Sequence, residues 1–317
     1  MPHSNPPDTE QPVQPSSQRA RLDGLTRTPT FVVGSRQGRP NRPSTDCPFC
    51  VGGLEAPDPY DVRWFVNRWP AMDGDRCEMV LYTPEHDAEF WTLGVAGARK
   101  VVDLWAERSH ALGSRDDVDY VLVFENRGAD VGSTIPHPHG QIYAFADVPP
   151  IPLRELIDGV LEPDDVASDL VVGRHGDWVV WVPEAPTWPY ELRLAPRSDA
   201  PDLVDERCDR DGLAAALVDG LARLDQLFDA PMPYMLWIHQ RPFDGGEWPG
   251  VRVHVHICPL YRSAGVQRYV AAAEQGAGVY FDPVDPAVAA QQLRSLPGSG
   301  STSDGGTAVA NTVEHRS

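Results

Sequence analysis

STIPHPHGQIYAF (Ser133–Phe145) carries a His-x-His pair that begins at His137, and GVRVHVHICPL (Gly250–Leu260) carries a second pair that begins at His254. Successive side chains alternate between the two faces of a β-strand, so two histidines separated by one residue project from the same face. The sequence therefore predicts two strands that each present two imidazoles on one side of a sheet.

Each His-x-His strand ends a longer internal repeat. Apolar stretches around Trp64 and Trp178 are followed by an alternating strand, an amphipathic helix and a further strand, at 119–126 and 233–240. Apolar residues recur close to a 3.6-residue period in the two helices, at Val95, Ala98, Val102, Trp105 and Leu112, and at Leu213, Leu217, Leu221, Leu224 and Phe228. Two copies of a strand, strand, helix, strand, strand unit predict an α+β fold with an antiparallel sheet.

The repeat also sets the expected domain organisation. We assign residues 23–150 to an N-terminal half and residues 151–295 to a C-terminal half, which together form one pseudo-symmetric unit. Residues 1–22 and 296–317 are rich in Pro, Gly, Ser and Thr and contain few apolar groups, so we expect them to be disordered tails.

The composition excludes several classes of function. The chain has 27 Lys+Arg and 46 Asp+Glu among 317 residues, a formal net charge of −19, and Lys100 is its only lysine. A protein that neutralises nucleic-acid phosphates needs a basic face, so we expect no nucleic-acid partner. No apolar run approaches the roughly 20 residues that span a bilayer, and no secretory signal is evident. We therefore expect a cytoplasmic protein with no membrane partner.

Cys47-Pro48-Phe49-Cys50 is a Cys-x-x-Cys motif, which can be a redox pair, half of a metal site, or neither. A redox pair usually stands at the start of a helix, whereas this motif lies in a Pro- and Gly-rich loop. Loop thiolates with histidines nearby suit tetrahedral zinc, which takes four sulfur or nitrogen ligands. We expect His86 and His137 to complete a Cys₂His₂ zinc site.

Gln141 lies two residues beyond His139, on the same predicted strand face as both histidines of the first pair. An imidazole beside an amide donor and nearby arginines can attack a phosphoryl group and stabilise the charge that develops on its oxygens. Thr134 adds a hydroxyl just upstream. An ordinary surface amide is the alternative for Gln141, and the adjacent histidines favour the chemical role.

These residues resemble a known family. The motifs HPHGQ (137–141), FENRG (124–128), CPFC (47–50), WPYE (188–191) and VHVH (253–256) occur in the order and approximate spacing of the galactose-1-phosphate uridylyltransferases, members of the histidine-triad superfamily. The resemblance covers about Arg36 to Glu274. It implies a histidine-triad-like fold and the ping-pong transfer of UMP from UDP-glucose to galactose 1-phosphate, which gives UDP-galactose and glucose 1-phosphate.

The resemblance also assigns roles to individual residues. His139 matches the nucleophile that becomes uridylylated, and Gln141 matches the amide that hydrogen-bonds the transferred phosphate. The remaining substrate-binding candidates are Arg36, Arg39, Asn67, Asn126, Thr134, Arg268 and Glu274. In the family, groups near the C-terminal end contact the sugar largely across a dimer interface, so the resemblance implies a homodimer.

Two metal sites follow from the same resemblance. Cys47, Cys50, His86 and His137 match the zinc ligands, the same set that the spacing suggests. A second site, described in some members as iron or zinc with a structural role, is matched by Glu155, His239, His254 and His256.

Two other functions stay open on the sequence alone. Relatives that transfer or phosphorolyse adenylyl groups, such as ADP-sugar or dinucleoside polyphosphate phosphorylases, tend to carry serine where Gly140 stands, so the glycine favours uridylyl transfer. A non-catalytic, metal-stabilised binding protein is the alternative of another class, and the presence of both His139 and Gln141 argues against it.

Overall fold

The computed structural model describes residues 20–38, 47–159 and 161–298. Within these residues the chain forms a nine-stranded sheet in which every pairing is antiparallel. The strands, in spatial order, are β3 (Arg63–Val66), β4 (Cys77–Leu81), β6 (His139–Phe145), β5 (Tyr120–Arg127), β10 (Tyr234–His239), β11 (His254–Pro259), β9 (Leu192–Pro196), β8 (Trp178–Trp181) and β7 (Val171–His175).

The order of the strands confirms the α+β class and the internal repeat. The first half contributes β3-β4-β6-β5, and the second contributes β10-β11-β9-β8 in the opposite spatial order, with β7 added at the edge. β5 and β10 pair at the centre, where Glu125 lies opposite Leu236. The two halves therefore share one continuous sheet about a pseudo-twofold axis.

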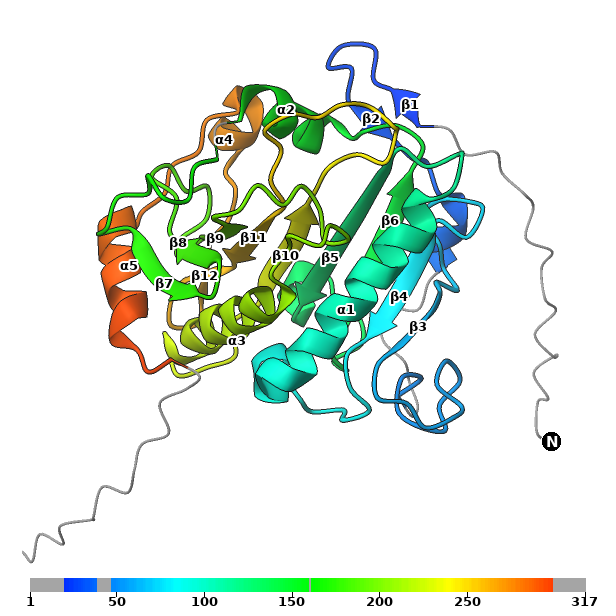
Figure 1. Ribbon diagram of the computed structural model, residues 1–317, viewed down its shortest axis with the longest axis horizontal. Coiled ribbons are helices and arrows are strands. Elements are labelled where there is room, and N and C mark those ends of the chain that lie inside the picture. The colour runs from blue at the N-terminus through cyan, green and yellow to red at the C-terminus, as the bar shows by residue number, and fades with distance from the viewer. Residues whose placement is uncertain (1–19, 39–46, 160, 299–317) are drawn as a thin grey trace, which may run out of the picture.

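Two long helices cover one face of this sheet. α1 (Gly94–Gly113) and α3 (Arg210–Gln226) lie side by side across it (Figure 1). The predicted apolar stripes face the core, with Trp105 and Leu217 fully buried, and each such side chain contributes roughly 1.5–3 kcal/mol by its removal from water. Val95 is the exception, because it stands in the first turn of α1 and is 42% exposed.

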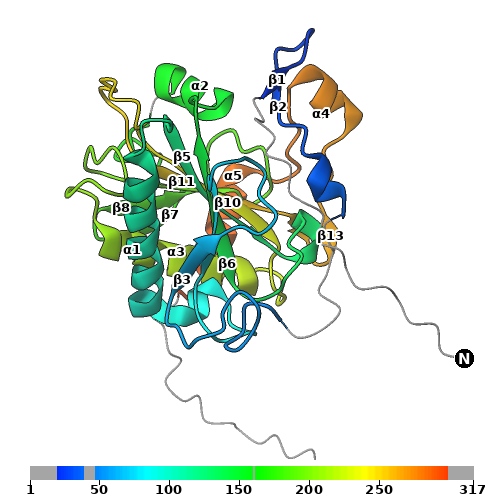
Figure 2. The same ribbon diagram turned by 90° about the vertical axis from the view of Figure 1, so that its right-hand side faces the viewer.

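Several of the shorter elements lie on the other face. In Figure 2, α1 lies on one side of the sheet, and β1, β2, α4 and β13 lie on the other. The bounds of the smaller elements are β1 (Arg21–Leu22), β2 (Pro29–Thr30), β12 (Tyr261–Ser263), β13 (Val266–Gln267), α2 (Pro150–Asp158), α4 (Ala272–Ala277), α5 (Pro286–Ser295) and the 3₁₀ turns η1 (Gly34–Gly38), η2 (Phe90–Leu93) and η3 (Ala129–Val131).

The tails are shorter at their inner ends than the sequence predicted. Arg21 and Leu22 pair with β2 rather than belonging to a tail. Leu296 at the other end is fixed, because Arg223 donates to its carbonyl at 2.8 Å. Residues 1–19 and 299–317, the rest of both expected tails, lie outside the described residues. None of the described helices is long and apolar enough to cross a membrane.

Candidate active site and metal centres

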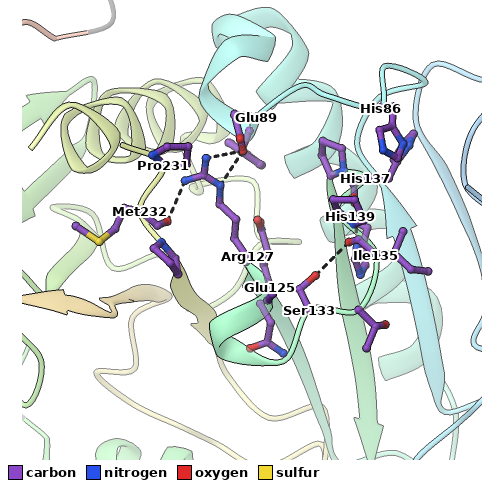
Figure 3. A pocket seen from close by; sticks show the side chains of 18 of the residues that line it. His86, Glu89, Glu125, Arg127, Ser133, Ile135, His137, His139, Pro231 and Met232 are labelled. Atoms are coloured by element: carbon purple, nitrogen blue, oxygen red, sulfur yellow. Dashed lines mark hydrogen bonds and ion pairs between the residues drawn. The ribbon is translucent and has the colours of Figure 1, made fainter. Parts of the chain in front are cut away.

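A cavity of about 550 Å³ opens at the end of β5 nearest the first His-x-His pair. One wall is the loop from Gly128 to Pro138, and Pro231–Pro233 of the second half forms the opposite wall (Figure 3). Its volume is in the range that holds a small organic ligand. Three predicted catalytic or substrate-binding residues line it, Asn126, Thr134 and His139, and so do three predicted zinc ligands, Cys47, His86 and His137.

His139 is the first residue of β6, and its ring is held by the backbone. Nδ1 lies 2.7 Å from the carbonyl oxygen of His137, so the Nδ1–H donates to that carbonyl and Nε2 carries the lone pair. The ring of Phe49 packs against it with centroids 5.2 Å apart. This tautomer is the one that a nucleophilic imidazole needs. The structure also corrects our expectation for the strand, because β6 begins at His139 and His137 precedes it.

Gln141 shares the face of β6 that points away from α1 and α3. Side chains at His139, Gln141 and Tyr143 are half-buried on this face, whereas Ile142 is fully buried against the helices. The Gln141 Oε1 atom lies 3.5 Å from Asn67 Nδ2, and Asn67 is itself fixed because its Oδ1 accepts from the Trp69 backbone at 2.8 Å. The structure thus brings two substrate-binding candidates together beside the predicted nucleophile.

Gly140 is required by packing behind this face. A Cβ atom at this position would lie 2.1 Å from the Tyr82 hydroxyl and 3.1 Å from the Phe124 carbonyl oxygen. A serine here would therefore displace Tyr82, whose side chain is buried in the core.

The predicted zinc ligands converge. The ligand atoms of Cys47, Cys50, His86 and His137 all lie within 4.8 Å of one another. Cys50 Sγ is 3.4 Å from His86 Nδ1 and 3.7 Å from His137 Nδ1, close to the roughly 3.6 Å that tetrahedral zinc bonds of about 2.3 and 2.1 Å imply. The residues therefore fit a zinc ion.

His137 is positioned for metal binding by its other ring nitrogen. Nε2 lies 2.8 Å from the Thr83 carbonyl and 3.0 Å from the Tyr60 hydroxyl oxygen, so the Nε2–H donates to these oxygens, and the Tyr60 hydroxyl donates its own hydrogen to the Phe49 carbonyl. Burial lowers the pKa of His137, so its imidazole is neutral at physiological pH. Such contacts leave Nδ1 as the ligand and are typical of metal-binding histidines.

The second predicted cluster also assembles. Oε2 of Glu155, on α2, lies 2.5 Å from His239 Nδ1, 3.1 Å from His254 Nε2 and 3.5 Å from His256 Nε2. Burial lowers the pKa of His256 to about 3, so this ring is neutral. Its buried Nε2 has no hydrogen-bond partner among the described residues. One carboxylate and three imidazoles fit zinc or iron.

The second cluster lies in the C-terminal half at the position that corresponds to His139 in the N-terminal half. His254 is the first residue of β11, as His139 is of β6, and its Nδ1 likewise lies 2.9 Å from the carbonyl two residues earlier, that of Arg252. His256 then corresponds to Gln141. The two strand starts and the shared Nδ1 contact therefore match His254 with His139, two residues away from the match with His137 that the sequence spacing suggests.

Arg36, Arg268 and Glu274 are not among the residues that line the cavity. Arg268 and Glu274 form a buried ion pair on the β13–α4 segment, each 4% exposed, and the Arg268 guanidinium stacks 5.1 Å from the Trp188 ring. Arg36 is half-buried in η1. Arg39 lies outside the described residues.

Sequence reasoning missed three charged residues that line the cavity: Glu89, Glu125 and Arg127. Burial raises the pKa of Glu125 to about 7, although the Tyr234 hydroxyl donates to its Oε1 at 2.8 Å. The FENRG motif contains two of these residues, and that motif was the available signal.

Comparison with known proteins agrees with the site. Residues 69–149 match the family described as galactose-1-phosphate uridyl transferase, N-terminal domain, and residues 158–298 match its C-terminal domain. Galactose-1-phosphate uridylyltransferases of Thermotoga maritima and Streptomyces lividans are 32% and 36% identical, over 86% and 82% of this chain and 97% and 82% of theirs. A solved uridylyltransferase structure covers 87% of this chain and 98% of its own, with a TM-score of 0.78 and 27% identity. The chain, a transferase with the predicted histidine-triad-like fold, therefore belongs to the galactose-1-phosphate uridylyltransferase family.

Proposed function

We propose that the protein is a UDP-glucose:hexose-1-phosphate uridylyltransferase that works through a covalent uridylyl-histidine. The observation that carries this proposal is His139, whose ring is held in the nucleophilic tautomer at the edge of a ligand-sized cavity. The family membership supports the same reaction.

The reaction needs little more from the protein than position and charge. Nε2 of His139 attacks the α-phosphorus of UDP-glucose, a nitrogen–phosphorus bond forms, and the bond to the β-phosphate oxygen breaks to release glucose 1-phosphate. A phosphate oxygen of galactose 1-phosphate then attacks the same phosphorus, which gives UDP-galactose and regenerates the imidazole. The positive charge on the uridylylated ring is stabilised by the Nδ1–H bond to the His137 carbonyl.

The amide of Gln141 is proposed to hold the transferred phosphate, with Thr134 and Asn126 on the cavity wall as further contacts. Zinc would be held by Cys47, Cys50, His86 and His137. In this place the metal supplies rigidity, because it ties the Cys-x-x-Cys loop to the residue whose carbonyl orients the nucleophile. A second zinc or iron ion at Glu155 would join α2 to the sheet.

We also propose that two copies assemble, and that Arg268 and Glu274 serve the cavity of the other copy. Their segment exposes several large apolar side chains, including Tyr269 (75%) and Phe281 (68%), which is typical of a surface that another chain covers. A cytoplasmic location remains a prediction from the sequence.

The test is the intact mass of the protein after mixing with UDP-glucose without an acceptor. We expect one uridylyl adduct per chain, on His139, which disappears on addition of galactose 1-phosphate as UDP-galactose forms. An adduct with an adenine-nucleotide donor instead would indicate the phosphorylase alternative, against which the contact between Gly140 and Tyr82 argues. No adduct with any nucleotide would favour a binding protein.

A further inference from the structure

Among the described residues, one arginine lines the cavity, and protein oxygens take up the N–H donors of its guanidinium. Arg127 is the last residue of β5 and its side chain is 13% exposed. Its Nε donates to Glu89 Oε2 at 2.7 Å, its Nη1 donates to the Met232 carbonyl at 2.9 Å, and its Nη2 donates to Asp225 Oδ2 at 3.0 Å. Nη1 also bonds Asp225 Oδ1. The N–H groups of this fork are directed at protein oxygens rather than at the cavity (Figure 3).

Asp225 is equally saturated. Its side chain is 10% exposed, and besides Arg127 it accepts from Trp91 Nε1 at 2.7 Å and from the Met232 backbone N–H at 2.9 Å. Two carboxylates, Glu89 and Asp225, surround one guanidinium. A phosphate that displaced the carboxylate of Asp225 would leave a buried charge without its partner.

The two ends of this network belong to opposite walls of the cavity. Gly128, directly after Arg127, begins the wall that leads to the histidines, and it adopts φ +96°, where a side chain would be strained. A Cβ there would lie 3.0 Å from Pro233 on the other wall. Met232 on that second wall is bonded through both its N–H and its carbonyl.

We propose that the Arg127–Asp225 pair is a positioning device that joins the two halves of the chain and sets the width of the substrate cavity. It does not bind the phosphates of the substrate. The inference rests on the proposed uridylyl transfer. In it, Arg127 holds the two walls of the cavity at a fixed separation. Misplacement of one wall by about 1 Å can slow a reaction about 100-fold.

The structure offers a matched control. Arg108 also has a side chain that is 13% exposed, and it makes a bidentate pair with Glu78, 3% exposed, between α1 and β4 outside the cavity. Arg127→Lys and Arg108→Lys each keep the positive charge of the side chain and remove its bidentate hydrogen bonding to a carboxylate. Both variants should lose similar thermal stability, and only the first should alter the cavity.

The experiment measures the first half-reaction. The rate of uridylyl-adduct formation at saturating UDP-glucose, and the dissociation constant of UDP, are measured for the wild type and both variants. We expect Arg127→Lys to slow adduct formation at least about 10-fold and Arg108→Lys to change it less than about 2-fold. Glu89→Gln, at the more exposed end of the network, should fold normally and give a smaller slowing in the same direction.

Equal rates in the two Arg→Lys variants would overturn the proposal, and so would unchanged rates in both Arg127→Lys and Glu89→Gln. A large loss of UDP affinity in Arg127→Lys with an unchanged rate at saturation would show that Arg127 binds phosphate directly, which also contradicts it. If the wild type forms no adduct, the proposed function fails instead. The wild-type measurement therefore separates the two failures.

Discussion

Replacing Glu125 with glutamine should change how the stability of the protein depends on pH. Glu125 is 5% exposed in the core, and its Oε2 atom has no hydrogen-bond partner among the described residues. Burial raises its pKa from 4.5 to about 7, against the opposing effects of the Tyr234 hydroxyl and the Arg127 charge. Tyr82 and Glu89 are the other titratable groups that face it.

The sign follows from where the proton is lost. The unfolded chain releases the Glu125 proton near pH 4.5, whereas the folded chain keeps it until about pH 7. The free energy of unfolding therefore falls as the pH rises from 4.5 to 7, and this loss stays constant above pH 7. A difference of 7 − 4.5 = 2.5 in pKa corresponds to about 3 kcal/mol of unfolding free energy.

Urea unfolding of the wild type and Glu125→Gln at fixed zinc, from pH 4 to 8.5, measures this directly. The amide can still accept from Tyr234 and carries no charge, so the variant should gain about 3 kcal/mol relative to the wild type between pH 4.5 and pH 7. Tyr234→Phe is the companion variant, because loss of the hydroxyl donor should move the transition to higher pH. A difference between wild type and Glu125→Gln that does not vary with pH would refute the reasoning.

Three further predictions concern the site. His139→Ala should abolish adduct formation and lower turnover at least about 10³-fold while zinc content and thermal stability, measured in parallel, stay near wild type; loss of metal would contradict the nucleophile assignment. Cys50→Ser should release zinc to a chromogenic chelator and lower the melting temperature. Tyr60→Phe loses the contact with His137 and should therefore weaken zinc retention about 10- to 100-fold in the same assay. Mixing His139→Ala chains with Arg268→Ala chains should restore activity that neither has alone; no restoration after subunit exchange would contradict a shared site.

The fold could be predicted from the sequence because both halves contain the same order of strands and amphipathic helix. Strands around Trp64 and Trp178 and helices with a 3.6-residue stripe must each bury one face, and antiparallel pairing of two such units gives a single sheet. What the spacing alone could not provide was the register. His137 and His254 are 117 residues apart in the sequence. In the structure, however, His139 and His254 are the residues that begin their strands and hold the same Nδ1 contact to the carbonyl two residues earlier.

The candidate zinc ligands could be predicted because zinc restricts both the type and the geometry of its ligands. Cys47 and Cys50 belong to one motif, His86 and His137 lie in two other parts of the sequence, and the structure brings the four together. Arg268 was harder to place, because its side chain is occupied by Glu274 and Trp188 within its own chain. The role proposed for it in the cavity of a second copy depends on an assembly that no single sequence displays.

Arg127 shows why a charged residue in a motif does not reveal its own chemistry. A lone arginine beside a phosphate-transfer site suggests a phosphate ligand, and the net charge of −19 strengthens that expectation, because some cation must attract anionic substrates. Yet the two carboxylates that neutralise it come from positions 89 and 225, and only tertiary packing brings them to the end of β5. Once both are in place, an added phosphate would face one guanidinium already shared by two anions. The attraction for the substrate is then left to backbone N–H groups, amides, imidazoles, the candidates Arg36 and Arg39, and any cation of a second copy. The separation of the cavity walls therefore matters more to this site than the charge of Arg127.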